Sequence, residues 1–227
     1  MPENTTLAQE LLQDLLHKLA RSRKSKQAII AVDAPDQSFQ WIGAVGETIT
    51  GEPVAENTPY FIASIDKLYN ATIALMLTES GTLDLGQSIS YYLPETITQG
   101  LHRVDERDLT AEITLMHLLT HTSGLADWFE DYPKGGSNLS TIVFKEAELG
   151  ALTNWRVMCV SIYTLFAPIP AVFGHTGSTG CWLFYCPDLD VTLSGSVEDA
   201  AAGAVPFGTA PIVLRILSKA GWKRRSS

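Results

Sequence analysis

Residues 58–81, TPYFIASIDKLYNATIALMLTESG, place a hydroxyl and an amine one helical turn apart at the start of a long apolar segment. The first six residues read as extended, and the final glycine is typical of a helix end. Because residues i and i+3 share one face of a helix, the Ser64 hydroxyl and the Lys67 amine are predicted to meet. Residues 68–79 are apolar on nearly every face, which predicts that this helix is buried.

The pairing of Ser64 with Lys67 has the chemistry of an activated nucleophile. A lysine in a dry site loses its proton more easily and can then accept the proton of a neighbouring serine. The start of a helix also offers backbone N–H groups and a positive dipole end, which stabilise a developing oxyanion. The same pattern would arise if Ser64 only capped the helix and Lys67 only extended to solvent.

Two further segments accompany the serine–lysine motif. They are residues 113–125, ITLMHLLTHTSGL, and residues 174–180, GHTGSTG. With these three motifs in this order, the chain resembles the serine β-lactamase-like hydrolases, in the branch that contains class C β-lactamases, D-alanyl-D-alanine carboxypeptidases and β-lactamase-fold esterases. The resemblance extends from about residue 27 to residue 207 and therefore covers most of the chain.

The resemblance assigns a role to the second glycine-rich segment. In that family a Lys/His-Thr/Ser-Gly triplet lies on the strand that borders the active site, and His175, Thr176 and Gly177 match it. The match implies that His175 and Thr176 line the acyl or carboxylate side of the pocket, and that Gly177 belongs to the same substrate-binding strand. A polar residue that merely closes a strand is the other interpretation of His175.

The resemblance also implies a reaction. A serine hydrolase of this kind forms an acyl-enzyme with a small ester, amide or β-lactam substrate and needs no cofactor or metal. Ser64 would be the nucleophile and Lys67 its base, and the backbone N–H groups of Ser64 and Ser178 would form the oxyanion hole. The alternative is a catalytically silent, truncated relative that acts as a binding or scaffold protein.

One element of the family pattern is missing from the chain. The family carries a Tyr-x-Asn or Ser-x-Asn element between the second and third motifs, and neither occurs here. About fifty residues separate Gly124 from His175, too few for the helical lobe at its usual size. The chain therefore resembles a family member that lacks a stretch between Asn138 and Asn154. Weakened activity is expected, with Tyr132 and Tyr163 the first candidates to replace the missing tyrosine.

The missing stretch also predicts how the chain associates. In the family this lobe packs over the apolar helix that begins near Ser64. A shortened lobe leaves part of that helix uncovered, and contiguous exposed apolar patches promote association. Self-association through this helix face is therefore expected.

Charge and composition narrow the possible partners. The net charge is −9 and the isoelectric point is near 5.0, which argues against nucleic acid or an anionic membrane as a partner. The first twenty residues do not read as a signal peptide, and no apolar run approaches the ~18 residues of a membrane span. These patterns predict a cytoplasmic protein. Cys181 and Cys186 would lie about 16 Å apart along one strand, too far for a disulfide.

The sequence also contains patterns that suggest a zinc site, a phosphate loop or an α/β-hydrolase motif, but each of these is less well supported. His117 and His121 have the i, i+4 spacing of a zinc pair, but Leu118 stands where a metalloprotease has glutamate. Helix packing or hydrogen bonding at the helix end explains them better. Residues 174–180 lack the Gly-Lys-Ser/Thr of a phosphate loop. Thr176 stands where the first glycine of Gly-x-Ser-x-Gly would be, which argues against an α/β-hydrolase.

The pattern of apolar residues predicts a single α+β domain over residues 1–227. We expect an antiparallel sheet flanked by N- and C-terminal helices, with a shortened helical insertion. The predicted lobes are a sheet lobe, residues 1–60 and 156–227, and a reduced helical lobe, residues 61–155. The individual predictions are a helix over 5–19, hairpins over 27–45 and 180–197, a short helix over 113–121, and a last helix from Pro211 to Ala220.

Overall fold

The computed structural model describes residues 2–21, 25–125, 170–199 and 205–222. The chain forms two compact units, residues 1–68 with 152–227 and residues 69–151. The predicted lobe boundary followed residue 60 and assigned Ser64 and Lys67 to the helical lobe. In the structure both residues belong to the unit that contains the sheet. No helix in the described ranges is long and apolar enough to cross a membrane.

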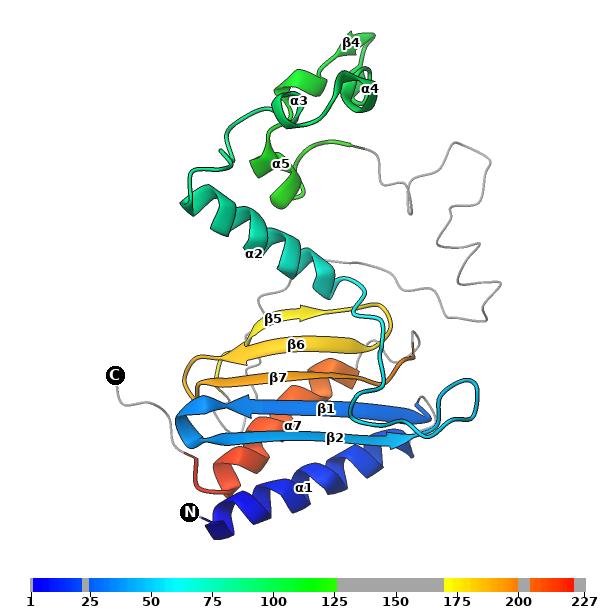
Figure 1. The fold of residues 1–227 in the computed structure, drawn as a ribbon, viewed down its shortest axis with the longest axis vertical. Helices are drawn as coiled ribbons and strands as arrows, with labels where there is room; N and C mark the ends of the chain where they lie inside the picture. Colours follow the sequence, from blue (N-terminus) through cyan, green and yellow to red (C-terminus); the bar gives the residue numbers. More distant parts are fainter. Residues whose placement is uncertain (1, 22–24, 126–169, 200–204, 223–227) are drawn as a thin grey trace. The chain divides into compact units, whose positions relative to one another are not determined.

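The sheet unit is built on a five-stranded antiparallel sheet with the strand order β2-β1-β7-β6-β5 (Figure 1). Two hairpins supply four of its strands, as predicted. β1 (Gln27–Ala34) turns through the 3-10 helix η1 (Pro35–Gln37) into β2 (Phe39–Gly46), and β6 (Cys181–Cys186) turns into β7 (Val191–Ser196). β5 (Phe173–Thr176) pairs with β6 and forms one edge of the sheet.

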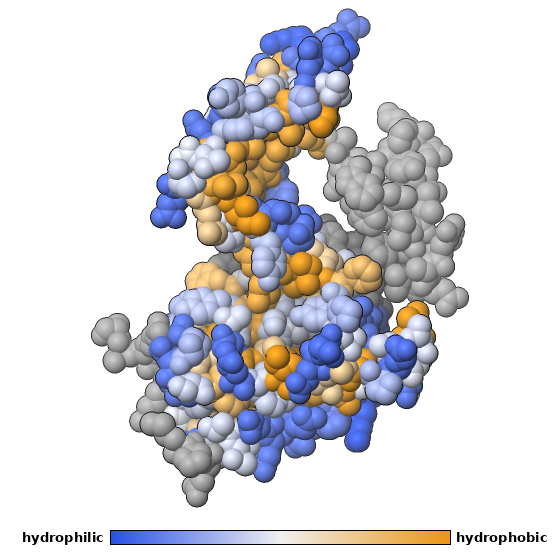
Figure 2. Space-filling model, in the orientation of Figure 1, coloured by the Kyte–Doolittle hydropathy of each residue, from blue (hydrophilic) through white to orange (hydrophobic). Residues whose placement is uncertain are grey.

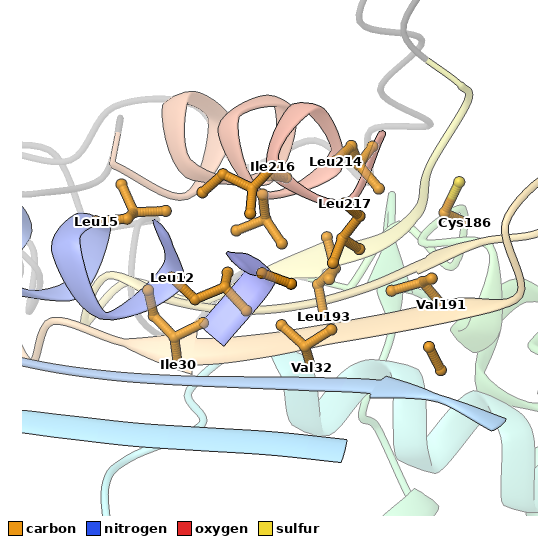
Figure 3. Packing of buried hydrophobic residues seen from close by; sticks show 14 of the residues in the cluster. Leu12, Leu15, Ile30, Val32, Cys186, Val191, Leu193, Leu214, Ile216 and Leu217 are labelled. Atoms are coloured by element: carbon orange, nitrogen blue, oxygen red, sulfur yellow. The ribbon is translucent and has the colours of Figure 1, made fainter. Parts of the chain in front are cut away.

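The N- and C-terminal helices cover one face of this sheet. α1 (Pro2–Ala20) and α7 (Val205–Lys219) lie side by side on it (Figure 1). Leucines of the helices meet β-branched and leucine side chains of the strands, and Figure 3 shows this layer. Because this packing buries large apolar side chains of both helices and of several strands at once, it is the main core of the described residues.

The side chains on the two faces of β6 contact different parts of the protein. Trp182, Phe184 and Cys186 are buried in the core beneath the terminal helices. Successive strand residues point to opposite faces, so Cys181 and Leu183 point away from those helices. Cys181 is nevertheless buried, and its thiol contacts the backbone of Ile62. The face of the sheet opposite the helices therefore carries the residues that meet the serine–lysine motif.

α7 begins earlier than the sequence predicted. The prediction placed Pro211 at the first helical turn, whereas the helix starts at Val205 and Pro211 lies inside it. Proline removes one helical hydrogen bond, which favours a helix start at that position. Here Pro206, Thr209 and Pro211 are all buried, so packing of the additional turns against the core outweighs the lost bond.

α2 (Ile65–Glu79) differs from its prediction in burial. Among its residues only Ile65 is buried. Apolar residues gather on its surface in Figure 2. The exposed side chains are Leu68 (37%), Tyr69 (52%), Ile73 (53%), Leu75 (56%), Met76 (63%) and Leu77 (37%). The prediction of a buried helix is wrong for the described structure, because an apolar surface is buried only where another layer covers it.

The unit of residues 69–151 is described as far as residue 125 and contains short elements joined by turns. α5 confirms the short helix predicted near residues 113–121. The elements are α3 (Ile89–Tyr92), α4 (Glu95–Thr98), β3 (Arg103–Val104), β4 (Arg107–Asp108), the 3-10 helix η2 (Thr110–Glu112) and α5 (Leu115–Leu119).

Candidate active site

Ser64 and Lys67 meet at the start of α2, as their spacing predicted. The Lys67 Nζ donates a hydrogen bond of 3.0 Å to the Ser64 Oγ. The backbone makes a tight first turn here, because the Lys67 N–H donates to the Ser64 carbonyl oxygen at 3.2 Å. Ser64 is half-buried and Lys67 is exposed. The expected dry environment of the lysine is therefore not present among the described residues.

The residues just ahead of Ser64 are held by side chains from the far end of the chain. The Phe61 N–H donates to the Glu198 Oε1 at 3.0 Å, and the Thr179 hydroxyl donates to the Phe61 carbonyl oxygen at 2.9 Å. The Cys181 thiol donates to the Ile62 carbonyl oxygen at 3.0 Å. Three side chains that follow or begin sheet strands thus fix the backbone that leads into Ser64.

The approach of this segment to the turn after β5 is very close. A Cβ atom on Gly177 would stand 2.7 Å from the Ile62 carbonyl oxygen and 2.9 Å from the Ala63 Cβ, and it would also overlap the Cys181 Sγ. Only glycine fits this position without a shift of its neighbours. Ala63 has a φ of 45°, in the left-handed region that costs an alanine roughly 1 kcal/mol. Close packing keeps this strained residue in place.

The His-Thr-Gly triplet lies on the edge strand next to this segment. His175 pairs with Leu183, and Thr176 pairs with Trp182. Paired residues of antiparallel strands share a face, so His175 lies on the face of Cys181 and Thr176 on the face of the core. The His175 Nδ1–H donates to the Thr176 carbonyl oxygen at 2.5 Å, which places the ring proton on Nδ1.

Ser178 follows the triplet in the tight turn between β5 and β6. This turn is closed by a hydrogen bond of 3.1 Å from the Gly180 N–H to the Gly177 carbonyl oxygen. Because Gly177 contacts residues 62 and 63, Ser178 and Ser64 each stand one residue away from the same contact. The structure thus brings the predicted nucleophile and the predicted oxyanion-hole residue into one neighbourhood.

Burial shifts the pKa values of Glu198 and Cys181, two of the side chains that hold residues 61–63. Burial raises the pKa of the Glu198 carboxyl, and the hydrogen bonds from the Phe61 N–H and the Ser196 hydroxyl oppose part of that rise. Burial also raises the pKa of the Cys181 thiol, and the nearby Glu198 adds to the effect. The thiol is therefore neutral at ordinary pH and carries the proton that it donates to Ile62.

The other predicted features have mixed outcomes. His117 caps α5, since its Nδ1 accepts from the Thr114 N–H at 3.2 Å, which confirms the prediction of helix-end bonding. Cys181 and Cys186 are both free, as their spacing predicted. Tyr132, Tyr163 and residues 138–154, where the missing stretch was predicted, lie outside the described residues.

Three residues that hold the site were not foreseen from the sequence. Glu198 and Thr179 were not singled out, and Cys181 was considered only as a thiol too far from Cys186 to form a disulfide. A weak signal was present for Glu198, because it is a charged residue directly after an apolar strand. Its partner lies 137 positions away along the chain, a distance that no local pattern reveals.

Comparison with known proteins gives a consistent result. The model of the β-lactamase family matches residues 12–156, well over half of the 227 residues. A β-lactamase of Providencia stuartii is 30% identical over 120 residues, which are 53% of this chain and 29% of that protein. Monacolin J acid methylbutanoyltransferase of Aspergillus terreus is 28% identical over 130 residues, 51% of this chain and 32% of that protein.

The matched stretch thus spans about a third or less of the length of these relatives. Among solved structures, that of SurE is similar in fold, with a TM-score of 0.58 at 15% identity. The match covers 99% of this chain and 78% of SurE. An identity this low bears on the architecture of the sheet and its helices and not on chemistry.

Proposed function

Because this chain belongs to the β-lactamase family, we propose that it is a serine hydrolase that acts through an acyl-enzyme on Ser64. The observation that carries the proposal is the 3.0 Å contact between the Lys67 Nζ and the Ser64 Oγ. A base must lie within hydrogen-bond reach of the proton that it removes, and this pair meets that condition.

The reaction begins with transfer of the proton of the Ser64 hydroxyl to the Lys67 amine. The Ser64 Oγ then attacks the carbonyl carbon of the substrate, and the negative charge passes to the carbonyl oxygen. Backbone N–H groups of Ser64 and Ser178 stabilise this oxyanion. As the bond to the leaving group breaks, Lys67 returns its proton to that group, and the acyl group remains on Ser64. Water then releases it as an acid.

The substrate class follows from this chemistry and from the names of the relatives. Both a β-lactamase and a methylbutanoyltransferase are among the similar proteins, and both names fit acyl transfer from a small carbonyl compound. We therefore favour a small ester, amide or β-lactam as the substrate. His175 and Gly177 would line the side of the pocket that receives its acyl or carboxylate group, whereas Thr176 lies on the opposite face of β5 from His175.

Release of the acyl group is expected to be slow. The family's Tyr-x-Asn element takes part in proton transfer, and no Tyr-x-Asn occurs in the chain. Loss of a group that transfers protons typically lowers a rate by ~10²–10⁴-fold. A chromogenic ester should therefore give a burst of about one equivalent of product, followed by a weak steady state.

Labelling of Ser64 tests the proposal directly. A fluorophosphonate or a penicillin should add one mass equivalent to the parent protein and none to the Ser64→Ala variant. Ser218→Ala, a change at an exposed serine of α7, is the matched control and should be labelled like the parent. Labelling that persists in Ser64→Ala would disprove the nucleophile. No labelling of the parent would favour the alternative of a silent binding protein.

We also infer that α2 promotes association between copies of the chain. Six large apolar side chains along it are more than a third exposed. Each Å² of apolar surface removed from water contributes roughly 25 cal/mol. A complex in which a second copy of the chain covers the apolar surface of α2 is therefore stabilised.

A further inference from the structure

Glu198 makes an unusual long-range contact with the backbone ahead of the nucleophile. It lies just after β7, and its Oε1 accepts hydrogen bonds from the Phe61 N–H at 3.0 Å and from the Ser196 hydroxyl at 3.3 Å. The Glu198 N–H in turn donates to the Ser196 Oγ at 3.0 Å, and this bond helps to orient Glu198. Glu198 therefore joins the end of β7 directly to the segment that leads into α2.

The three anchors of this segment are not equivalent. Thr179 and Cys181 donate to carbonyl oxygens, whereas Glu198 is the acceptor recorded for the Phe61 N–H among the described residues. Glu198 thus provides the anchor that the other two side chains cannot replace, because neither of them accepts from this N–H group.

We propose that Glu198 is a positioning residue for the nucleophile: by holding the Phe61 N–H it keeps the Ser64 hydroxyl aligned with the turn that contains Ser178. The proposal rests on the proposed function, in which Ser64 is acylated. The Ser64–Lys67 hydrogen bond lies within one helical turn and does not depend on Glu198. Glu198 therefore controls where the activated hydroxyl lies, and Lys67 controls its activation.

The strained backbone at Ala63 explains why this alignment needs an anchor. Ala63 has a φ of 45°, and such a conformation persists only when the surroundings hold it. Without the bond to Glu198 the segment can relax toward an unstrained backbone and move away from Gly177. A displacement of about 1 Å at a reacting group can lower a rate by ~10²-fold.

The experiment compares two substitutions at one position. Glu198→Ala removes the acceptor, and Glu198→Gln removes the charge but keeps an oxygen that can accept from the Phe61 N–H. Val213→Ala truncates a core side chain of α7 and serves as the control for a loss of stability alone. For each protein we would measure the acylation rate constant with a p-nitrophenyl ester, the amide hydrogen exchange of residues 61–64, and thermal unfolding.

The expected results separate positioning from general stability. Glu198→Ala should be acylated about 10²-fold more slowly than the parent. Exchange at Phe61 should be faster by at least about tenfold in that variant. Glu198→Gln should stay within a few-fold of the parent in both measurements, and Val213→Ala should show parent-like acylation although it melts earlier.

Either of two results would overturn the proposal. One is parent-like acylation and Phe61 exchange in Glu198→Ala, and the other is a Glu198→Gln variant as impaired as the alanine variant. An inert parent protein would instead contradict the proposed function, and the exchange measurement would still show whether Glu198 holds the segment.

Discussion

α2 and α7 have the same length and a similar apolar character, yet α7 is largely buried and α2 is largely exposed. Each spans 15 residues. α7 buries eight of its residues, and α2 buries only Ile65. α7 lies on the sheet beside α1 (Figure 1), whereas the described part of α2 leaves most of its apolar side chains exposed.

The difference shows that apolar composition and burial are separate properties of a helix. α7 contributes to stability because its apolar stripe meets a second apolar layer. Under the proposed function α2 would contribute chemistry, because the hydroxyl and the amine that meet at its start would be the nucleophile and its base. Substitutions in the two helices should accordingly affect different measurements.

The largest expected effect concerns the lysines of the two helices. Lys67→Arg in α2 keeps the positive charge but removes the ability to become a neutral base. Acylation of Ser64 should slow by ~10²–10⁴-fold. Lys219→Arg, at the exposed end of α7, is the control and should leave the rate unchanged. Stopped-flow measurement of the ester burst would check both. A Lys67→Arg variant that is acylated as fast as the parent would exclude Lys67 as the base.

A pair of leucines compares the packing of the two helices. Leu217 of α7 is fully buried, and Leu75 of α2 is 56% exposed. Leu217→Ala should lower the free energy of unfolding by about 2–5 kcal/mol, because it leaves a cavity in the core. Leu75→Ala should change it by less than about 0.5 kcal/mol. Urea unfolding of both variants would test this, and equal losses would show that α2 is packed as tightly as α7.

The exposed surface of α2 gives the third test. If it promotes association, Leu75→Lys combined with Met76→Lys should shift the protein toward the monomer. Ile212→Lys, at an exposed apolar position of α7, should have a smaller effect. Light scattering across a dilution series would measure the molar mass of each variant. A parent protein that is monomeric at all concentrations would contradict the association predicted from α2.

The smallest expected effect is a dependence of stability on pH. The buried side chains of α7 carry no charge, whereas the segment ahead of α2 is held by the ionisable Glu198. The pKa of Glu198 in the folded state lies above its ordinary value of 4.5, because burial disfavours its charge. The folded state therefore binds more protons than the unfolded state in that range. Stability from this group is present below pH 4.5 and falls as the pH rises through the folded pKa.

Comparison with Glu198→Gln isolates this effect. The parent should lose unfolding free energy relative to the Gln variant as the pH increases from about 4 to 7. Cys181 is the neighbouring titratable group, and its raised pKa keeps it neutral over this interval. Parallel pH profiles of the two proteins would show that Glu198 does not titrate in the expected direction.

The sequence predicted those parts of the fold and site that depend on local patterns. The β1–β2 and β6–β7 hairpins have strong alternation and turn signals, and the contact between Ser64 and Lys67 follows from helical periodicity alone. The exposure of α2 did not follow from its apolar pattern, which predicted a buried helix. It was expected only from the shortened lobe, because burial depends on which other layers cover a helix. The start of α7 was missed because Pro211 is a strong local signal that packing overrides.

The side chains that hold residues 61–63, just ahead of Ser64, show the same limit. The contact between Phe61 and Glu198 joins two positions with no common motif, so only the folded arrangement reveals it. Gly177 was recognised through the family triplet. Its physical reason, the close approach of Ile62 and Ala63, is likewise visible only in three dimensions.

The pairing of β1 with β7 has a consequence for how the protein is made. Ile29 pairs with Ser196, so the central part of the sheet joins residues near opposite ends of the chain. Pairings between such distant residues close large loops and form slowly. During synthesis the hairpin of β1 and β2 emerges long before β7, and a two-stranded hairpin is marginally stable by itself.

Ser64 and Lys67 can approach each other as soon as α2 forms. Their placement by Thr179, Cys181 and Glu198 must wait for the last strands, so the candidate active site is completed at the end of folding.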